Sequence, residues 1–197
     1  MTQMPRVAHL SAGVGLLAAI AIAAPALANG EWPPDTYKLE AESFKQVGQT
    51  LGCGLSYKVE WTNDASEKIG AQGSLYFFFN PANGGSGVLL KTAGLVDAKP
   101  APVATAWIEA EGYGKTDNFT HEPSDAAGTF FGTKFADPKS FMLPALMTHY
   151  GFVLDLAFKD RPGDERVVLP AASGQVRKQV EDCMAALDSQ MDTSEQH

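Results

Sequence analysis

The stretch from Leu55 to Thr62 constrains the fold of this 197-residue chain more than any other. Apolar side chains alternate there with polar ones, and the apolar set is Leu55, Tyr57, Val59 and Trp61. Because successive side chains of a β-strand point to opposite faces, this period of two predicts a strand with one buried face and one solvated face. We therefore expect this part of the chain to belong to a β-sheet that covers a core on one side.

Six further segments have the composition of strands, and turn residues separate them. Asn83-Gly84 predicts a hairpin turn because both residues tolerate a positive φ, and Arg161-Pro162-Gly163-Asp164 predicts a type II turn. The spacing of these signals predicts a mainly β fold, which would be an antiparallel β-sandwich or flattened barrel of about seven strands with a C-terminal amphipathic helix. The six segments are 75–79, 88–90, 103–111, 129–135, 152–158 and 166–169.

Two segments near the C-terminus favour helices. Asp137-Pro138 is typical of an N-cap followed by a first helical position, and Pro144 interrupts the helix soon afterwards, so we expect a short, broken helix that ends near Gly151. Ser173 can cap a longer helix whose apolar side chains recur at helical spacing and should dock on the sheet. This stripe consists of Val176, Val180, Cys183, Met184 and Leu187.

The first 28 residues are typical of a cleavable secretory signal. Arg6 precedes an apolar run from Val14 to Ala24, and Ala26-Leu27-Ala28 supplies the small residues that a signal peptidase requires. The apolar run is too short for a comfortable membrane span. We expect a mature chain that begins near Asn29, has no membrane span and is periplasmic or secreted.

The chain after residue 28 has the size of a single domain. We expect an extended lead segment over 29–50, because Trp32-Pro33-Pro34 fixes φ and removes hydrogen-bond donors. A single β-rich domain with its helix should follow over 51–189, and residues 190–197 should form a flexible tail. Within the domain, residues 112–127 are glycine-rich and polar, which favours an exposed loop.

The two cysteines of the chain, Cys53 and Cys183, favour a disulfide bond. Two cysteines in an oxidising compartment more often form a bridge than remain free. Cys183 lies on the apolar stripe of the predicted C-terminal helix, where it can reach a strand beneath. A reactive thiol is the alternative, but Glu181 and Asp182 beside Cys183 would raise its pKa and suppress the thiolate.

The charge of the chain argues against nucleic acid as a partner. The sequence has 15 basic and 23 acidic residues, a formal net charge of −8, whereas nucleic acids and anionic membranes attract basic surfaces. Gly114-Lys115-Thr116 matches the end of a phosphate-binding loop, but Glu109 stands where that motif requires its first glycine. We expect no cofactor.

Met142, Met147 and His149 are candidate ligands for copper. Thioether and imidazole groups suit copper, and the break at Pro144 could bring the three side chains together. Methionines in an apolar stretch are, however, more often part of a core. A periplasmic copper-binding protein is therefore an alternative hypothesis for the function.

Trp107, Glu109 and Glu111 are candidate ligand-binding residues. On the strand predicted over 103–111 the three share one face, with the two carboxylates about 7 Å apart, which is near the separation found in glycosidases. Trp107 could then stack on a sugar. The simpler interpretation is a solvated strand face on an acidic protein, and a carbohydrate-active enzyme is the less favoured alternative.

The order of these elements resembles the small periplasmic β-rich proteins of alphaproteobacteria, of which the invasion-associated locus B family is the best named. The resemblance covers most of residues 50–190 and consists of order and spacing. It implies a cell-envelope protein without established catalytic residues. We therefore expect a noncatalytic exported protein that binds a partner protein or a small ligand. The segments that carry the resemblance are Cys53-Gly54-Leu55, Asp137-Pro138 to Met147, Phe152 to Phe158, Val168-Leu169-Pro170 and Ser173-Gly174 to Cys183.

Overall fold

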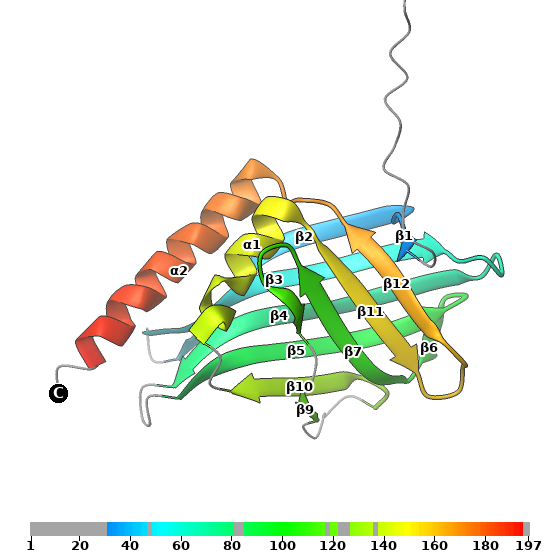
Figure 1. Ribbon diagram of the computed structural model, residues 1–197, viewed down its shortest axis with the longest axis horizontal. Coiled ribbons are helices and arrows are strands. Elements are labelled where there is room, and N and C mark those ends of the chain that lie inside the picture. Colours follow the sequence, from blue (N-terminus) through cyan, green and yellow to red (C-terminus); the bar gives the residue numbers. More distant parts are fainter. Residues whose placement is uncertain are drawn as a thin grey trace, which may run out of the picture.

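Two β-sheets pack face to face in the computed structural model of the protein, and helices extend the smaller layer (Figure 1). The structure describes residues 31–46, 49–80, 85–116, 119–121, 127–135 and 138–194, so the predicted signal over 1–28 lies outside the described residues. Both sheets are open, and their inward side chains form one hydrophobic cluster. The predicted mainly β fold is confirmed, and it is a sandwich without a closed barrel.

The large sheet contains the longest strands of the protein. Its order is β2-β3-β4-β5-β10-β9 with antiparallel neighbours, and β6 pairs with the end of β5. The alternating stretch from Leu55 to Thr62 falls within β3, and its apolar side chains are buried as predicted. The strands are β2 (Thr36–Gln46), β3 (Gln49–Thr62), β4 (Lys68–Asn80), β5 (Gly85–Val96), β6 (Lys99–Ala101), β9 (Thr120–His121) and β10 (Phe130–Phe135).

The small sheet has the order β1-β12-β11-β7-β8, and its strands cross those of the large sheet obliquely (Figure 1). Strand β1 is parallel to β12, whereas the other pairs are antiparallel. Gly163, at the predicted turn before β12, has a φ of 83°, as the third position of a type II turn requires. The strands are β1 (Glu31–Trp32), β7 (Val103–Ala110), β8 (Gly114–Thr116), β11 (Phe152–Phe158) and β12 (Asp164–Leu169).

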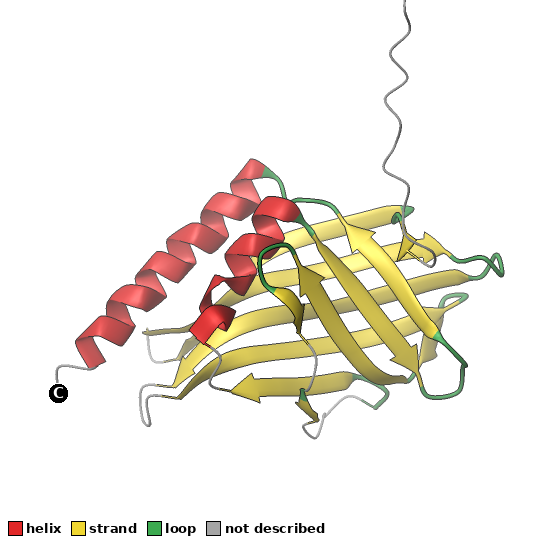
Figure 2. Ribbon diagram, viewed as in Figure 1, coloured by secondary structure: helices red, strands yellow, loops and turns green. Residues whose placement is uncertain are grey.

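Helices cover the part of the large sheet that the small sheet does not reach (Figure 2). They are the 3-10 helix η1 (Pro138–Met142), α1 (Leu143–Tyr150) and α2 (Gly174–Ser194). The predicted short, broken helix is thus confirmed, because Pro144 begins a new helical turn where no hydrogen bond is lost. It ends at Gly151, whose φ of 82° favours glycine and where a Cβ would lie 2.3 Å from the carbonyl oxygen of Leu169.

Helix α2 lies against β3 and is joined to it by the predicted disulfide. Cys53 and Cys183 are bonded, with their Cα atoms 5.8 Å apart. The hydroxyl of Ser173 accepts a hydrogen bond from the N–H of Val176 at 3.4 Å, so the predicted cap is also present. The helix continues to Ser194, beyond the expected start of the tail at 190, because Met191 still packs against the core. The tail was predicted to begin at residue 190, and this prediction is wrong for residues 190–194, which are helical.

The sequence prediction missed β1, β2, β6, β8 and β9, so the described residues contain twelve strands where seven were predicted. The lead segment contains all of β2, an edge strand that places Lys38, Glu40 and Glu42 on its outward face. Charged side chains are common on edge strands, where they oppose pairing with other chains, and they hide the alternation from a hydropathy pattern. The expected loop over 112–127 also contains buried structure, since Thr116 of β8 is fully buried opposite Ile108.

Candidate functional site

The face of the large sheet that points away from the small sheet contains an apolar groove of about 400 Å³. This face is turned away from the viewer in Figure 1. The volume lies within the range of small-molecule sites, and four adjacent strands contribute to the walls. The lining residues are Phe44 of β2, Leu51 and Gly52 of β3, Tyr76, Phe78, Phe79 and Asn80 of β4, and Leu89 of β5.

Strand register explains the hollow shape. Phe44, Gly52, Phe78 and Gly87 lie opposite one another across β2, β3, β4 and β5, so aromatic rings alternate with glycines in one row. A Cβ at Gly52 would lie 3.5 Å from the Cβ of Phe44 and 3.0 Å from the carbonyl oxygen of Phe77. A Cβ at Gly52 would thus be tightly contacted, so this position favours glycine and the groove has no side chain at this point of its lining.

A β-bulge turns one more apolar side chain toward the groove. Phe44 pairs with Gly52 and Lys45 pairs with Thr50, so Leu51 is the extra residue of β3. A bulge of this kind changes the direction of the side chains around it. Leu51 lines the groove, whereas the buried Thr50 lies on the other side of the sheet, in a cleft lined also by residues of α2.

One wall of the groove carries a fixed hydroxyl group. Tyr76 donates a hydrogen bond to the carboxylate of Glu42 on the edge strand. Burial of the phenol, together with this bond, raises the pKa of Tyr76 to about 12. Tyr76 therefore stays neutral near pH 7. Across the groove, Phe44 is 55% exposed although it is a large apolar side chain.

The predicted ligand-binding residue Trp107 lies on the outward face of the small sheet, within a network of charges. It pairs in register with Asp155, which is only 3% exposed. Arg166 Nε lies 3.4 Å from Asp155 Oδ1, and Arg166 Nη2 lies 3.2 Å from the predicted Glu109. Lys115 Nζ lies 4.2 Å from the centre of the Trp107 ring, which leaves this face of the indole covered by a cation.

Burial controls the acidity of Asp155. Loss of hydration raises the pKa of its carboxyl group to about 6, although Arg166, Trp107 and Lys115 act in the opposite direction. The carboxylate is nevertheless engaged by Arg166 on its own sheet. The network thus pairs charges of opposite sign on one face of the small sheet.

Glu109 and Glu111 line one shallow cavity of about 280 Å³ beside Gly151, so the structure brings these two predicted residues together. The expected geometry is wrong, because β7 ends at Ala110 and Glu111 belongs to the following turn. Glu109 is paired with Arg166. At the start of β7, a register shift in the pairing with β11 leaves Val103 buried and Ala104 exposed.

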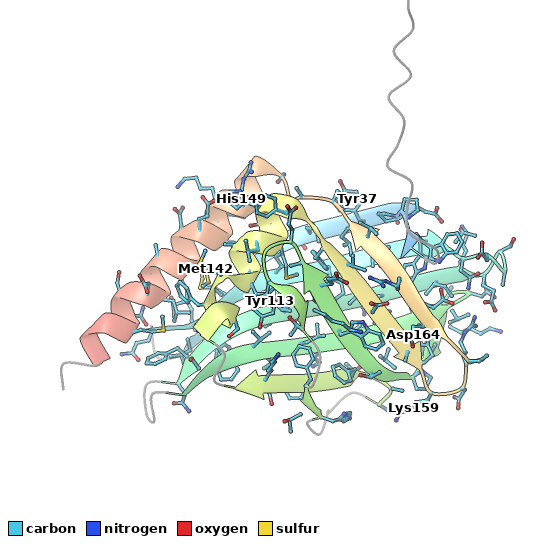
Figure 3. The ribbon with its side chains drawn as sticks, in the orientation of Figure 1. Tyr37, Tyr113, Met142, His149, Lys159 and Asp164 are labelled. Atoms are coloured by element: carbon cyan, nitrogen blue, oxygen red, sulfur yellow. A yellow bond between two sulfur atoms is a disulfide. The ribbon has the colours of Figure 1, made fainter. Side chains whose placement is uncertain are left out.

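The structure does not bring Met142, Met147 and His149 together. Met147 is fully buried in the core, whereas Met142 is 52% exposed at the start of α1. His149 lies toward the other end of the helix and pairs with Glu181 of α2, its Nε2 2.7 Å from the carboxylate (Figure 3). Among the described residues, no three His, Cys, Asp or Glu side chains lie together as a group that could hold a metal ion.

Sequence reasoning missed the groove, although one signal for it was present. The segment Leu75-Tyr76-Phe77-Phe78-Phe79 is apolar at every position, so an antiparallel strand there must turn apolar side chains outward as well as inward. Phe44 lay in the segment expected to be only a lead. The contributions of Leu51 and Gly52 depend on the bulge and on register, which a single strand pattern does not reveal.

Comparison of the chain with protein-family models, with curated proteins and with solved structures finds no match. Among the helices that the structure describes, none is long and apolar enough to cross a membrane.

Proposed function

We propose that this protein is a noncatalytic binding protein, exported to the periplasm or secreted, that holds an apolar group of a small ligand in the groove of the large sheet. The observation that carries the proposal is the groove itself, which the rings of Phe44, Tyr76 and Phe78 line together with two leucines and one glycine. Aromatic and aliphatic walls with few polar groups are typical of small-molecule sites. Transfer of apolar surface from water into such a site is favourable.

Three features support export. The first 28 residues have the pattern of a secretory signal, and the resemblance in element order is to periplasmic proteins. The bond between Cys53 and Cys183 suits an oxidising compartment.

The proposal is tested with phenylnaphthylamine, an uncharged aromatic probe that fluoresces in apolar surroundings. Phe44→Ser removes a ring from the groove and should weaken binding of the probe by about fivefold to tenfold, as expected for the loss of a large apolar contact. Phe44 lies on an edge strand and is half exposed, so the substitution leaves the core intact. The dissociation constant is measured by fluorescence titration.

The matched control is Tyr37→Ser. Tyr37 is another exposed aromatic residue of β2, 51% accessible, and it does not line the groove (Figure 3). This variant should bind the probe like the unmodified protein. Equal binding by all three proteins, or equal weakening by both substitutions, would show that the groove is not the binding site.

A further inference from the structure

The hydrogen bond between Tyr76 and Glu42 places a carboxylate beside the apolar groove. Glu42, Gly54 and Tyr76 lie opposite one another across β2, β3 and β4, so the bond crosses the sheet over Gly54. Gly52 lines the groove in the next row of the sheet and is the diagonal neighbour of Glu42. Diagonal neighbours on antiparallel strands are about 7–8 Å apart. A negative charge therefore stands close to the groove although its walls are mostly apolar.

Two aromatic residues flank Gly52 within its own row. Phe44 lies opposite it on β2 and Phe78 lies opposite it on β4, and adjacent strands are about 5 Å apart. A group above Gly52 is therefore within roughly 6 Å of both strands that carry these rings, which is the range over which a ring attracts a cation. Tyr76 adds a third ring to the lining. Several rings around a gap are the chemistry that recognises alkylated ammonium groups.

The basic side chains near this part of the sheet do not neutralise Glu42. Among the described residues, no lysine or arginine forms an ion pair with its carboxylate. Lys45 lines the cleft on the other side of the sheet. On the face of the groove, Lys58 is six residues along β3 from Gly52, about 20 Å, and Lys91 is two rows and two strands from Gly52. Salt screens charges over about 8–10 Å, so Glu42 dominates the potential near Gly52.

We propose that the ligand of the groove is a small organic cation whose alkylated ammonium group lies above Gly52, between Phe44 and Phe78 and close to the carboxylate of Glu42. This inference rests on the proposed function, because it names the group that the groove holds. A trimethylammonium group presents methyl groups to apolar walls and a positive charge to rings and carboxylates. The groove, at about 400 Å³, has the size of a small-molecule site, so the ligand is bound as a free molecule.

The experiment compares choline with 3,3-dimethylbutan-1-ol, which has the same shape but an uncharged carbon in place of the nitrogen. Binding is measured by calorimetry and by displacement of phenylnaphthylamine. Choline should bind about tenfold more tightly than the alcohol. Glu42→Gln retains an oxygen that can accept the hydrogen bond of Tyr76 but removes the charge. It should weaken choline binding by about fivefold and leave binding of the alcohol and of phenylnaphthylamine unchanged.

Two further variants separate the charge from the rings. Glu40→Gln is the matched control, because Glu40 lies two residues from Glu42 on the same face of β2 and does not line the groove. It removes the same charge from the chain and should leave choline binding unchanged. Phe44→Leu replaces a ring with another apolar side chain. It should weaken choline binding by about fivefold and binding of the alcohol by less than about twofold, because only the cation is attracted by the ring.

Each failure is distinguishable. The cation site is overturned if choline binds no more tightly than the alcohol, responds equally to Glu42→Gln and Glu40→Gln, or ignores Phe44→Leu. The proposed function still stands in these cases when Phe44→Ser weakens binding of phenylnaphthylamine, and it is overturned when Phe44→Ser has no effect on that probe. Vesicles of phosphatidylcholine that bind the protein through Glu42 and Phe44, without binding of free choline, overturn the inference in favour of a lipid surface.

Discussion

The outward faces of the two sheets differ in how their side chains find partners. On the small sheet, Asp155 is buried against Arg166, and Lys115 covers Trp107. On the large sheet, Phe44 is exposed and lines an apolar groove together with Gly52. Charged side chains on one face can form ion pairs with each other within a single layer. Apolar rings, in contrast, are stabilised only when another group covers them and excludes water.

This difference directs the functional interpretation toward the large sheet. The candidates predicted from sequence, Trp107 and Glu109, lie on the face where Lys115 covers the indole ring and Arg166 pairs with the carboxylate. The groove lies on the face over which the described residues place no second layer. An apolar hollow rimmed by a few polar groups is the more common form of a ligand site.

The largest expected effect concerns the end of the large sheet that carries the groove. Cys53 follows Gly52 in β3, so the disulfide holds the floor of the groove to α2. Cys53→Ala combined with Cys183→Ala should lower the free energy of unfolding by about 2–5 kcal/mol, measured by urea denaturation. Reductant should destabilise the unmodified protein and leave the double variant unchanged. An unfolding midpoint that does not respond to either treatment contradicts a structural role for the bond.

The next effect tests the charged face of the small sheet. The pKa of Asp155 is raised to about 6 from 3.8, so the folded state holds its proton more tightly than the unfolded state. The free energy of unfolding contributed by this group is therefore present below pH 4 and is lost as the pH rises toward 6, by roughly 2–3 kcal/mol. Asp155→Asn removes this dependence.

Relative to the unmodified protein, Asp155→Asn should become more stable as the pH is raised from 4 to above 6. The difference between the two proteins is the measured quantity, because other carboxylates such as Glu67, whose pKa is lowered by Arg161, act in the opposite direction. Asp160→Asn, at an exposed turn, is the control. Parallel pH profiles for Asp155→Asn and the unmodified protein would show that the buried carboxyl group has no raised pKa.

The smallest effect sharpens the comparison within β5. Leu89→Ser should weaken phenylnaphthylamine binding by about fivefold, because the side chain lines the groove. Leu95→Ser alters a half-buried leucine on the same strand and the same face, outside the groove, and should leave binding unchanged. Val153→Ser on the outward face of the small sheet should also leave binding of the probe unchanged. Loss of binding in all three variants means that the probe reports general loosening and not the groove.

Local patterns were sufficient for much of the fold. The alternation in β3, the apolar stripe of α2 and the glycine that ends α1 are each decided by neighbours in sequence. The prediction of the disulfide also needed only the compartment and the position of Cys183 on the stripe. The sequence analysis missed the edge strand β2 because its alternation combines small, polar and charged residues. It missed the end of α2 because packing of Met191 continues the helix past a polar sequence.

The sequence by itself determined the elements of this protein: a mainly β chain, its C-terminal helix and the pair of bonded cysteines. Only the tertiary structure decided which outward face exposes apolar side chains around a groove. The row of Phe44, Gly52, Phe78 and Gly87 comes from four strands. Strand register sets these neighbours, and it depends on pairing between distant segments and on a bulge at Leu51, which no local pattern encodes.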